Sequence, residues 1–112
     1  MQQITNINDS PKQTLEISIP EGNVASLTLK YDVVMSCIKC DFNYSQVNTL
    51  LPDVAFNNFI ITQNLNFLSR YSNIIPFGLA VIGSVQYDPN SQDDFSSGRF
   101  KMYLLSKDEL TV

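Results

Sequence analysis

Two cysteines, Cys37 and Cys40, have the C-x-x-C spacing that is used in redox and zinc sites. They fall in a segment of alternating residues, where a β-strand would place them on opposite faces with Cα atoms about 10 Å apart. A disulfide needs Cα atoms closer than about 7 Å. A zinc ion needs two more ligands, and the sequence has no other cysteine and no histidine. We therefore predict reduced thiols and no metal, with Cys40 in the core and Cys37 on the other side of the sheet.

Three acidic residues close together, Asp88, Asp93 and Asp94, could supply oxygen ligands to Ca²⁺ or a pair of carboxylates for glycoside chemistry. Their spacing does not match an EF-hand loop, so a solvated loop is favoured. The absence of histidine removes the Ser-His-Asp and Cys-His nucleophile systems, and with them the side chain that normally titrates near neutral pH. We predict no enzymatic activity and no cofactor.

The charge balance is mildly acidic, with seven Lys+Arg against eleven Asp+Glu and a net charge of −4. This balance argues against nucleic acid or an anionic membrane as a partner, and no run of about 18 apolar residues is present to span a bilayer. Charged residues make up only 16% of the chain, and eleven Asn, seven Gln and twelve Ser supply much of the polar surface. Two interpretations remain open, which are ordinary compositional variation and outer faces that other subunits cover.

The N-terminus has neither a basic start nor an apolar run, so no secretion signal is predicted. Folding in a cytoplasm is the matching expectation, and cysteines there stay reduced.

Alternation of apolar and polar residues indicates three strands in the first half of the chain, over residues 13–19, 27–32 and 38–44. A Pro-Glu-Gly-Asn turn over 20–23 separates the first two. These segments predict an antiparallel meander with one solvent-facing side. Residues 55–62 alternate less regularly, which predicts a fourth strand covered on both faces.

The second half contains the one predicted helix, over residues 64–71, where apolar residues recur at spacings of three and Asn64 can cap the first turn. A long strand over 77–87, a polar loop over 88–98 and a last strand over 99–105 follow. The predicted fold class is all-β and mainly antiparallel: a small β-sandwich or a partly open barrel with one short helix.

The length of 112 residues fits a single domain, and no repeat or linker divides the chain. We predict one domain over 1–112, with residues 1–10 and 106–112 as terminal arms that can be mobile.

Phe95 is the only large apolar side chain of the 88–98 loop. It is either tucked under the loop or presented to a partner, and burying a Phe contributes about 2 kcal/mol. Arg99, at the entry of the last strand, can pair with Asp93 or Asp94. Phe77, which follows a proline, is a second aromatic residue with both a packing and an interface interpretation.

Several segments together resemble one known family, the baseplate plug proteins of contractile-tailed bacteriophages. The resemblance covers roughly residues 11–107 and depends on the order of the following segments: Gln13-Thr14-Leu15, Leu27-Thr28-Leu29-Lys30-Tyr31, Asn64-Leu65-Asn66-Phe67-Leu68, Pro76-Phe77-Gly78-Leu79, Asp93-Asp94-Phe95, and Gly98-Arg99 entering Phe100-Lys101-Met102-Tyr103-Leu104.

The resemblance implies a non-enzymatic virion protein at the central, host-facing end of the tail, folded in the host cytoplasm during assembly. Its implied partners are the hub and tail-tube proteins and further copies of itself in a homo-oligomer, without nucleic-acid recognition or membrane insertion. Strand edges and loops would make the contacts. The predicted interface residues are Asn64, Phe77, Asp93, Asp94, Phe95 and Arg99.

The alternative interpretation is a small β-sandwich module that binds carbohydrate or another small ligand. It would use exposed aromatic residues, for which Tyr44, Tyr87 and Tyr103 are the candidates. The absence of Trp, the commonest ring for stacking on sugars, counts against this alternative.

Overall fold

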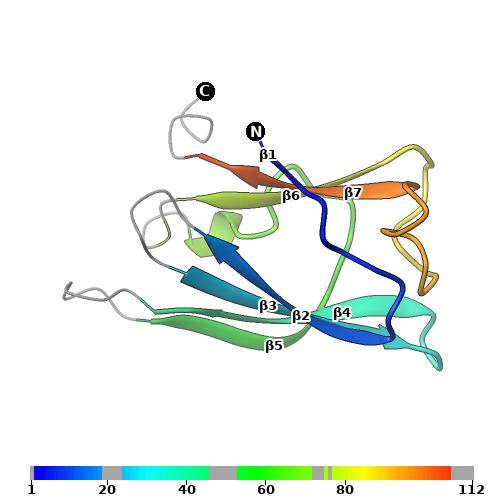
Figure 1. Ribbon diagram of the computed structural model, residues 1–112, viewed down its shortest axis with the longest axis horizontal. Coiled ribbons are helices and arrows are strands. Elements are labelled where there is room, and N and C mark those ends of the chain that lie inside the picture. Colours follow the sequence, from blue (N-terminus) through cyan, green and yellow to red (C-terminus); the bar gives the residue numbers. More distant parts are fainter. Residues whose placement is uncertain (1, 19–23, 46–52, 72–74, 76, 107–112) are drawn as a thin grey trace.

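Two antiparallel sheets face each other in the computed structural model, which describes residues 2–18, 24–45, 53–71, 75 and 77–106 (Figure 1). The elements are β1 (Gln2–Ile4), β2 (Lys12–Ser18), β3 (Val24–Asp32), β4 (Cys37–Tyr44), β5 (Val54–Ile60), the 3-10 turn η1 (Ser69–Tyr71), β6 (Gly78–Gly83) and β7 (Phe100–Leu105). One sheet has the strand order β2-β3-β4-β5 and the other has the order β1-β7-β6. The fold is therefore a small all-β sandwich, and the partly open barrel is set aside.

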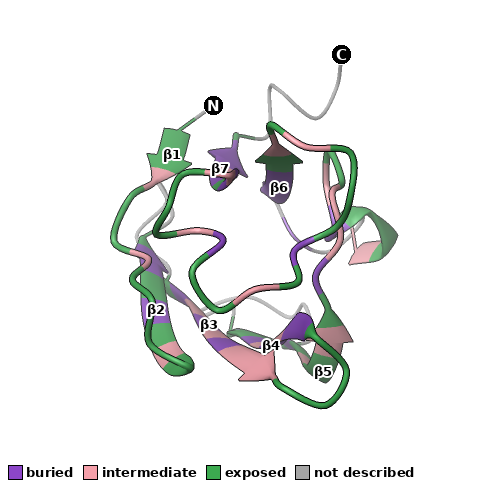
Figure 2. Cartoon of the chain, turned by 90° about the vertical axis from the view of Figure 1, so that its right-hand side faces the viewer, coloured by how far each residue is buried: buried purple, intermediate pink, exposed green. Residues whose placement is uncertain are grey.

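The meander β2-β3-β4 confirms the first three predicted strands. Each strand pairs with the next along its whole length, with Leu15 opposite Leu27 and Leu29 opposite Cys40. Apolar residues at every second position are buried, whereas the intervening polar residues are half-buried or exposed, and Figure 2 shows this alternation of burial along the strands. The two-residue period thus marks a sheet with one covered side. The predicted turn over 20–23 lies outside the described residues.

β5 is an edge strand whose residues Ala55, Asn57, Asn58 and Ile60 are exposed, so the prediction that it is covered on both faces is wrong. Its irregular pattern comes from a β-bulge, because Cys40 pairs with Phe59 whereas Phe42 pairs with Phe56. The extra residue allows both Phe56 and Phe59 to pack against the core. Asn58 at the bulge has a φ of 57°, in the left-handed region that Asn tolerates better than most residues.

The predicted helix over 64–71 is also wrong, since only the short η1 turn forms there. Asn64 exchanges two backbone hydrogen bonds with Val81 of β6, at 3.0 and 2.8 Å. The side-chain oxygen of Asn66 accepts the N–H of Leu68 at 3.0 Å and that of Leu79 at 3.2 Å. These bonds hold the segment against the outer edge of β6, which removes the backbone groups that a helix would use.

Two strands of the three-stranded sheet differ from the sequence prediction. The predicted strand over 77–87 ends at Gly83, and β1 was not predicted at all. β1 pairs with β7, with Gln3 opposite Tyr103. Residues 107–112, most of the predicted C-terminal arm, lie outside the described residues.

A layer of aromatic rings fills the space between the two sheets. Phe42 of β4 stacks on Phe56 at a centroid distance of 5.3 Å, and Phe77 meets Tyr44 edge-on at 5.1 Å. Cys40 is fully buried in the same core, as predicted, and Cys37 is buried at the start of β4. Both cysteines are free thiols.

Candidate interaction surface

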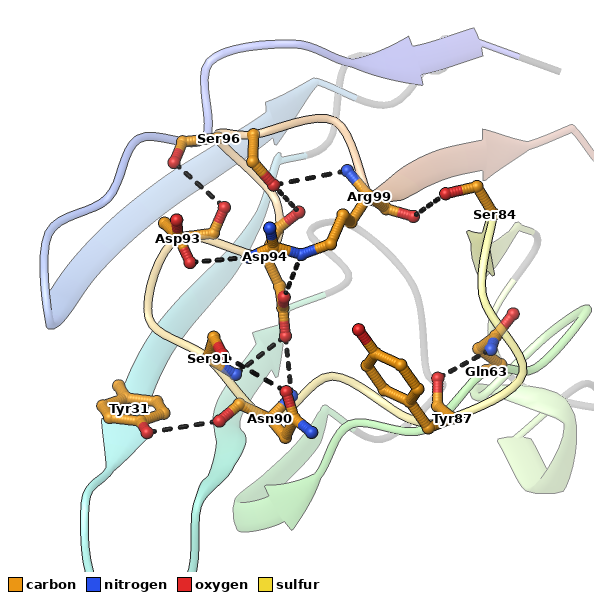
Figure 3. A network of polar contacts seen from close by, with 11 residues as sticks. Tyr31, Gln63, Ser84, Tyr87, Asn90, Ser91, Asp93, Asp94, Ser96 and Arg99 are labelled. Carbon is orange, nitrogen blue, oxygen red and sulfur yellow. Dashed lines mark hydrogen bonds and ion pairs between the residues drawn. The ribbon is translucent and has the colours of Figure 1, made fainter.

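The late loop, residues 88–98, is organised by the buried carboxylate of Asp94 (Figure 3). Its Oδ2 accepts the backbone N–H of Asn90 at 2.6 Å and that of Ser91 at 2.8 Å. Its Oδ1 accepts the Nε–H of Arg99 at 2.9 Å. The side chain is 0% exposed, and its charge is balanced by two backbone N–H groups of the loop and by the adjacent Arg99.

Arg99 joins both of the aspartates that the sequence offered as its partners. Its Nη2 donates to Oδ1 of Asp93 at 2.7 Å, in addition to the bond to Asp94. The hydrogen bond that Arg99 donates to Asp94 is the main cause that raises the pKa of Arg99 above its ordinary value. Because these carboxylates are engaged by Arg99 and by backbone N–H groups, the loop is closed by its own ion pairs. The described residues contain no group of three metal-ligating side chains.

Phe95 takes the tucked position of the two that the sequence left open. It is partly buried and packs against the core, with its ring 6.4 Å from that of Phe100. Gly98 completes the loop at a φ of 86°, where a residue with Cβ would be strained.

The late loop is also anchored to distant parts of the chain. Tyr31 of β3 donates its hydroxyl to the carbonyl of Asn90 at 3.2 Å, and Gln92 donates to the carbonyl of Asp9 at 2.6 Å. Gln63 binds the preceding segment, since its amide group donates to the carbonyls of Val85 and Tyr87 at 2.8 Å each. The role of Gln63 was not predicted from the sequence, because nothing in the local pattern distinguishes it from the other glutamines.

The two remaining predicted interface residues occupy different environments. Phe77 lies in the core at 2% exposure. Asn64 is exposed, and its side-chain oxygen accepts the N–H of Asn66 at 2.9 Å. Asp93, Asp94, Phe95 and Arg99 therefore share one site, whereas Asn64 and Phe77 do not join it. Because the side chains of Asp94 and Phe77 are buried, they can affect a partner only by positioning the residues that cover them.

A second surface feature is the hairpin tip between β3 and β4, residues 33–35. Val33, Val34 and Met35 are 75%, 94% and 55% exposed. Burial normally stabilises such side chains, so three adjacent ones in solvent make the tip a candidate contact site. This tip was not predicted from the sequence, although a Val-Val-Met run between two predicted strands is the signal that could have found it.

The hairpin tip has a fixed shape, because ionic and backbone contacts brace its base. Asp32 Oδ1 accepts the N–H of Met35 at 3.0 Å, and Lys39 pairs with Asp32 Oδ2 at 2.9 Å. These two contacts, the backbone bond first, lower the pKa of the Asp32 carboxyl. Ser36 adopts a left-handed φ of 49° as the chain enters β4.

An aromatic groove of about 590 Å³ lies between β5 and the 64–71 segment. The faces of the aromatic rings that line this groove are largely covered by neighbouring rings. Phe56 lies between Phe42 and Tyr71, with centroid distances of 5.3 and 5.7 Å, and Phe59 stacks on Phe67 at 5.8 Å. Rings stacked in this way leave few faces for a sugar.

The tyrosines of the carbohydrate interpretation do not form one binding surface. Tyr44 is fully buried, Tyr103 is partly buried and Tyr87 is 48% exposed. No observation therefore favours that alternative over a contact role. In the part of the chain that the structure describes, no helix is long and apolar enough to cross a membrane.

Comparison with models of known protein families gives no match for this chain, and none of the curated protein sequences matches it either.

Proposed function

We propose that this chain is a non-enzymatic structural component of a phage tail baseplate, where it plugs the central tail tube and hub and contributes to baseplate assembly. The resemblance of the segments quoted above to baseplate plug proteins is what supports the choice of this assembly. The observation that carries a contact role is the exposure of the three apolar side chains of the hairpin tip, Val33, Val34 and Met35.

The form of the hairpin tip supports docking against another protein. A braced turn that presents apolar side chains loses little conformational entropy when it is buried, so most of the burial energy remains available for binding. Burying one such side chain contributes about 1.5–3 kcal/mol. The tip is therefore large enough to act as a central anchor of an interface.

The late loop supports the same role by its closed network. The charged groups of Asp94 and Arg99 bind each other and fix the loop. Elsewhere, in β4, the thiol of Cys40 is buried, and desolvation raises its pKa to about 12. In a plug, a loop of fixed shape would define the surface that meets the hub or the tube.

Co-purification tests the proposal. The full chain with an affinity tag is expressed together with the hub and tail-tube proteins of the same genome, and bound proteins are identified by mass spectrometry. We expect at least one of the two to be retained. Combined Val33→Ser, Val34→Ser and Met35→Ser substitutions should weaken retention at least 100-fold, because about 3 kcal/mol or more of apolar burial is removed.

Leu65→Ser is the matched control, because Leu65 is also an exposed apolar residue, at 77%, and lies outside the hairpin tip. We expect retention to be unchanged in this variant. A wild-type chain that binds neither the hub nor the tube protein would contradict the proposed function.

A further inference from the structure

The outer edge of β2 carries backbone groups that have no partner among the described residues. The backbone carbonyl of Pro11 accepts the N–H of Tyr31 at 2.8 Å, and the strand register places Lys12 opposite Lys30. In an antiparallel ladder the backbone groups of alternate residues point to opposite sides of the strand. Odd-numbered residues of β2 therefore bond to β3, whereas the N–H and C=O groups of Lys12, Thr14, Glu16 and Ser18 point outward. For Thr14, Glu16 and Ser18 these groups have no partner among the described residues.

The other strand edges of the described chain are protected. The 64–67 segment covers β6, because Asn64 bonds to Val81 and Phe67 N–H donates to Leu79 at 2.9 Å. A bulge at Asn58 interrupts β5, and β1 has only three residues. Bulges, covers and short edge strands are devices that prevent strand addition. β2, with seven residues in regular register, has none of them.

The outer edge of β2 lies at one side of the sandwich. Figure 2 shows β1 and β2 on the same side of the sandwich, at the edges of the two sheets. A surface cavity of about 240 Å³ separates residues 2–6 from residues 16–18.

The charges on the solvent face of β2 indicate which strand fits. Lys12 and Glu16 are both exposed, and neither forms an ion pair with the described residues. Lys12 faces Lys30 across the β2-β3 ladder, and Lys30 is already paired with Asp41 at 2.9 Å. A negative charge on the open side of Lys12 would therefore be favourable.

We propose that two copies of this chain pair antiparallel through β2, with Thr14 on the two-fold axis. In this register the two Thr14 residues exchange backbone hydrogen bonds, and Lys12 of each copy lies directly opposite Glu16 of the other. An axis at Lys12 would oppose two lysines, and an axis at Glu16 would oppose two glutamates, which destabilises a strand pair. The pairing joins the two four-stranded sheets into one continuous sheet. It does not depend on the baseplate role.

Light scattering and sedimentation equilibrium of the isolated full chain test the pairing. We expect a reversible species of twice the 12.6 kDa chain mass at high protein concentration. Glu16→Lys places lysines opposite each other at two symmetric positions, so the dissociation constant should rise about tenfold or more. The combined Lys12→Glu and Glu16→Lys variant restores opposite charges and should regain wild-type association.

A backbone substitution gives an independent measurement. Thr14→Pro removes an N–H that points away from β3, so the monomer keeps its ladder while the central bonds of the dimer are lost. Thr14→Val is the control, because it loses only the hydroxyl contact with Thr28 at 3.0 Å and keeps the N–H. We expect Thr14→Pro to be a folded monomer and Thr14→Val to associate.

Two results would overturn the proposal. One is a wild-type chain that stays monomeric up to about 1 mM, a concentration at which even weak association is detectable. The other is a dimer whose dissociation constant is the same in wild type, Glu16→Lys and the charge-swapped variant.

Discussion

Replacing Asp94 should destabilise the protein far more than replacing its neighbour Asp93. Asp94→Ala removes the acceptor of two backbone N–H groups and of Arg99 Nε. A hydrogen bond to a charged group contributes about 1.5–3 kcal/mol, and a donor left without a partner costs about 1–3 kcal/mol. Because the freed donors are partly buried and can bind some water, we expect the free energy of unfolding to fall by about 3–4 kcal/mol in total.

Asp94→Asn gives an intermediate test of the same reasoning. The amide keeps the side-chain volume and one oxygen for the N–H groups of Asn90 and Ser91, but its NH₂ group then faces the Nε–H of Arg99. This contact between two donors replaces the ion pair and forms no hydrogen bond. We therefore expect the free energy of unfolding to fall by about 2 kcal/mol.

Asp93→Ala is the control, because it removes only an exposed contact to Arg99, in which the Asp93 side chain is 57% exposed. Exposed ion pairs contribute little to stability.

Urea unfolding followed by far-UV circular dichroism and tyrosine fluorescence measures all three variants, since the chain has no Trp. For Asp94→Ala the loss corresponds to a decrease in Tm of about 15 °C. A stability loss no larger in Asp94→Ala than in Asp93→Ala would refute the assignment of Asp94 as the organiser of the late loop.

Three further predictions concern the thiol, the glutamine anchor and acid stability. Desolvation raises the pKa of Cys40 to about 12, so a disulfide-exchange reagent at about pH 8 should label this thiol only after unfolding. Gln63→Ala should cost about 2–3 kcal/mol of unfolding free energy, because its amide group makes three hydrogen bonds, whereas exposed Gln86→Ala should change little. Backbone hydrogen bonds, then lysine contacts, lower the pKa values of Asp32 and Asp41 below 3.8, so the unfolded chain binds more protons in acid. The two carboxylates stabilise the folded chain fully above pH 3.8, and this contribution is lost as the pH falls through their lowered pKa values in the folded chain. In the double variant Asp32→Asn with Asp41→Asn, the free energy of unfolding should therefore depend less on pH below about 4.

Strands that face a single core were predictable because the pleat imposes a two-residue period. Leu15 and Ile17 of β2 alternate with exposed polar residues, and their strand was located to within one residue at its start. The bulge in β5 was not predictable, since it depends on Asp41, which accepts the N–H of Asn58 at 2.9 Å from the neighbouring strand.

The helix prediction over 64–71 failed for a tertiary reason. Its spacing of apolar residues is helical, but Leu65 is exposed at 77%, so the pattern does not correspond to one buried face. The segment instead bonds to β6, which begins more than ten residues later.

The late loop was predicted in part. The pairing of Arg99 with Asp93 or Asp94 followed from their closeness in sequence, and both pairs form. The burial of Asp94 did not follow, because it requires backbone donors that the loop presents only once it is folded. Gln63, which lies 22 residues from Val85, belongs to the same class of long-range contacts.

The most direct test of the central proposal is to locate the chain in assembled tails. Tails are assembled with a gold-labelled full chain and imaged by cryo-electron microscopy. The proposal predicts label on the tail axis at the host-facing end. Tails that are complete and carry no copy of the expressed chain would contradict it.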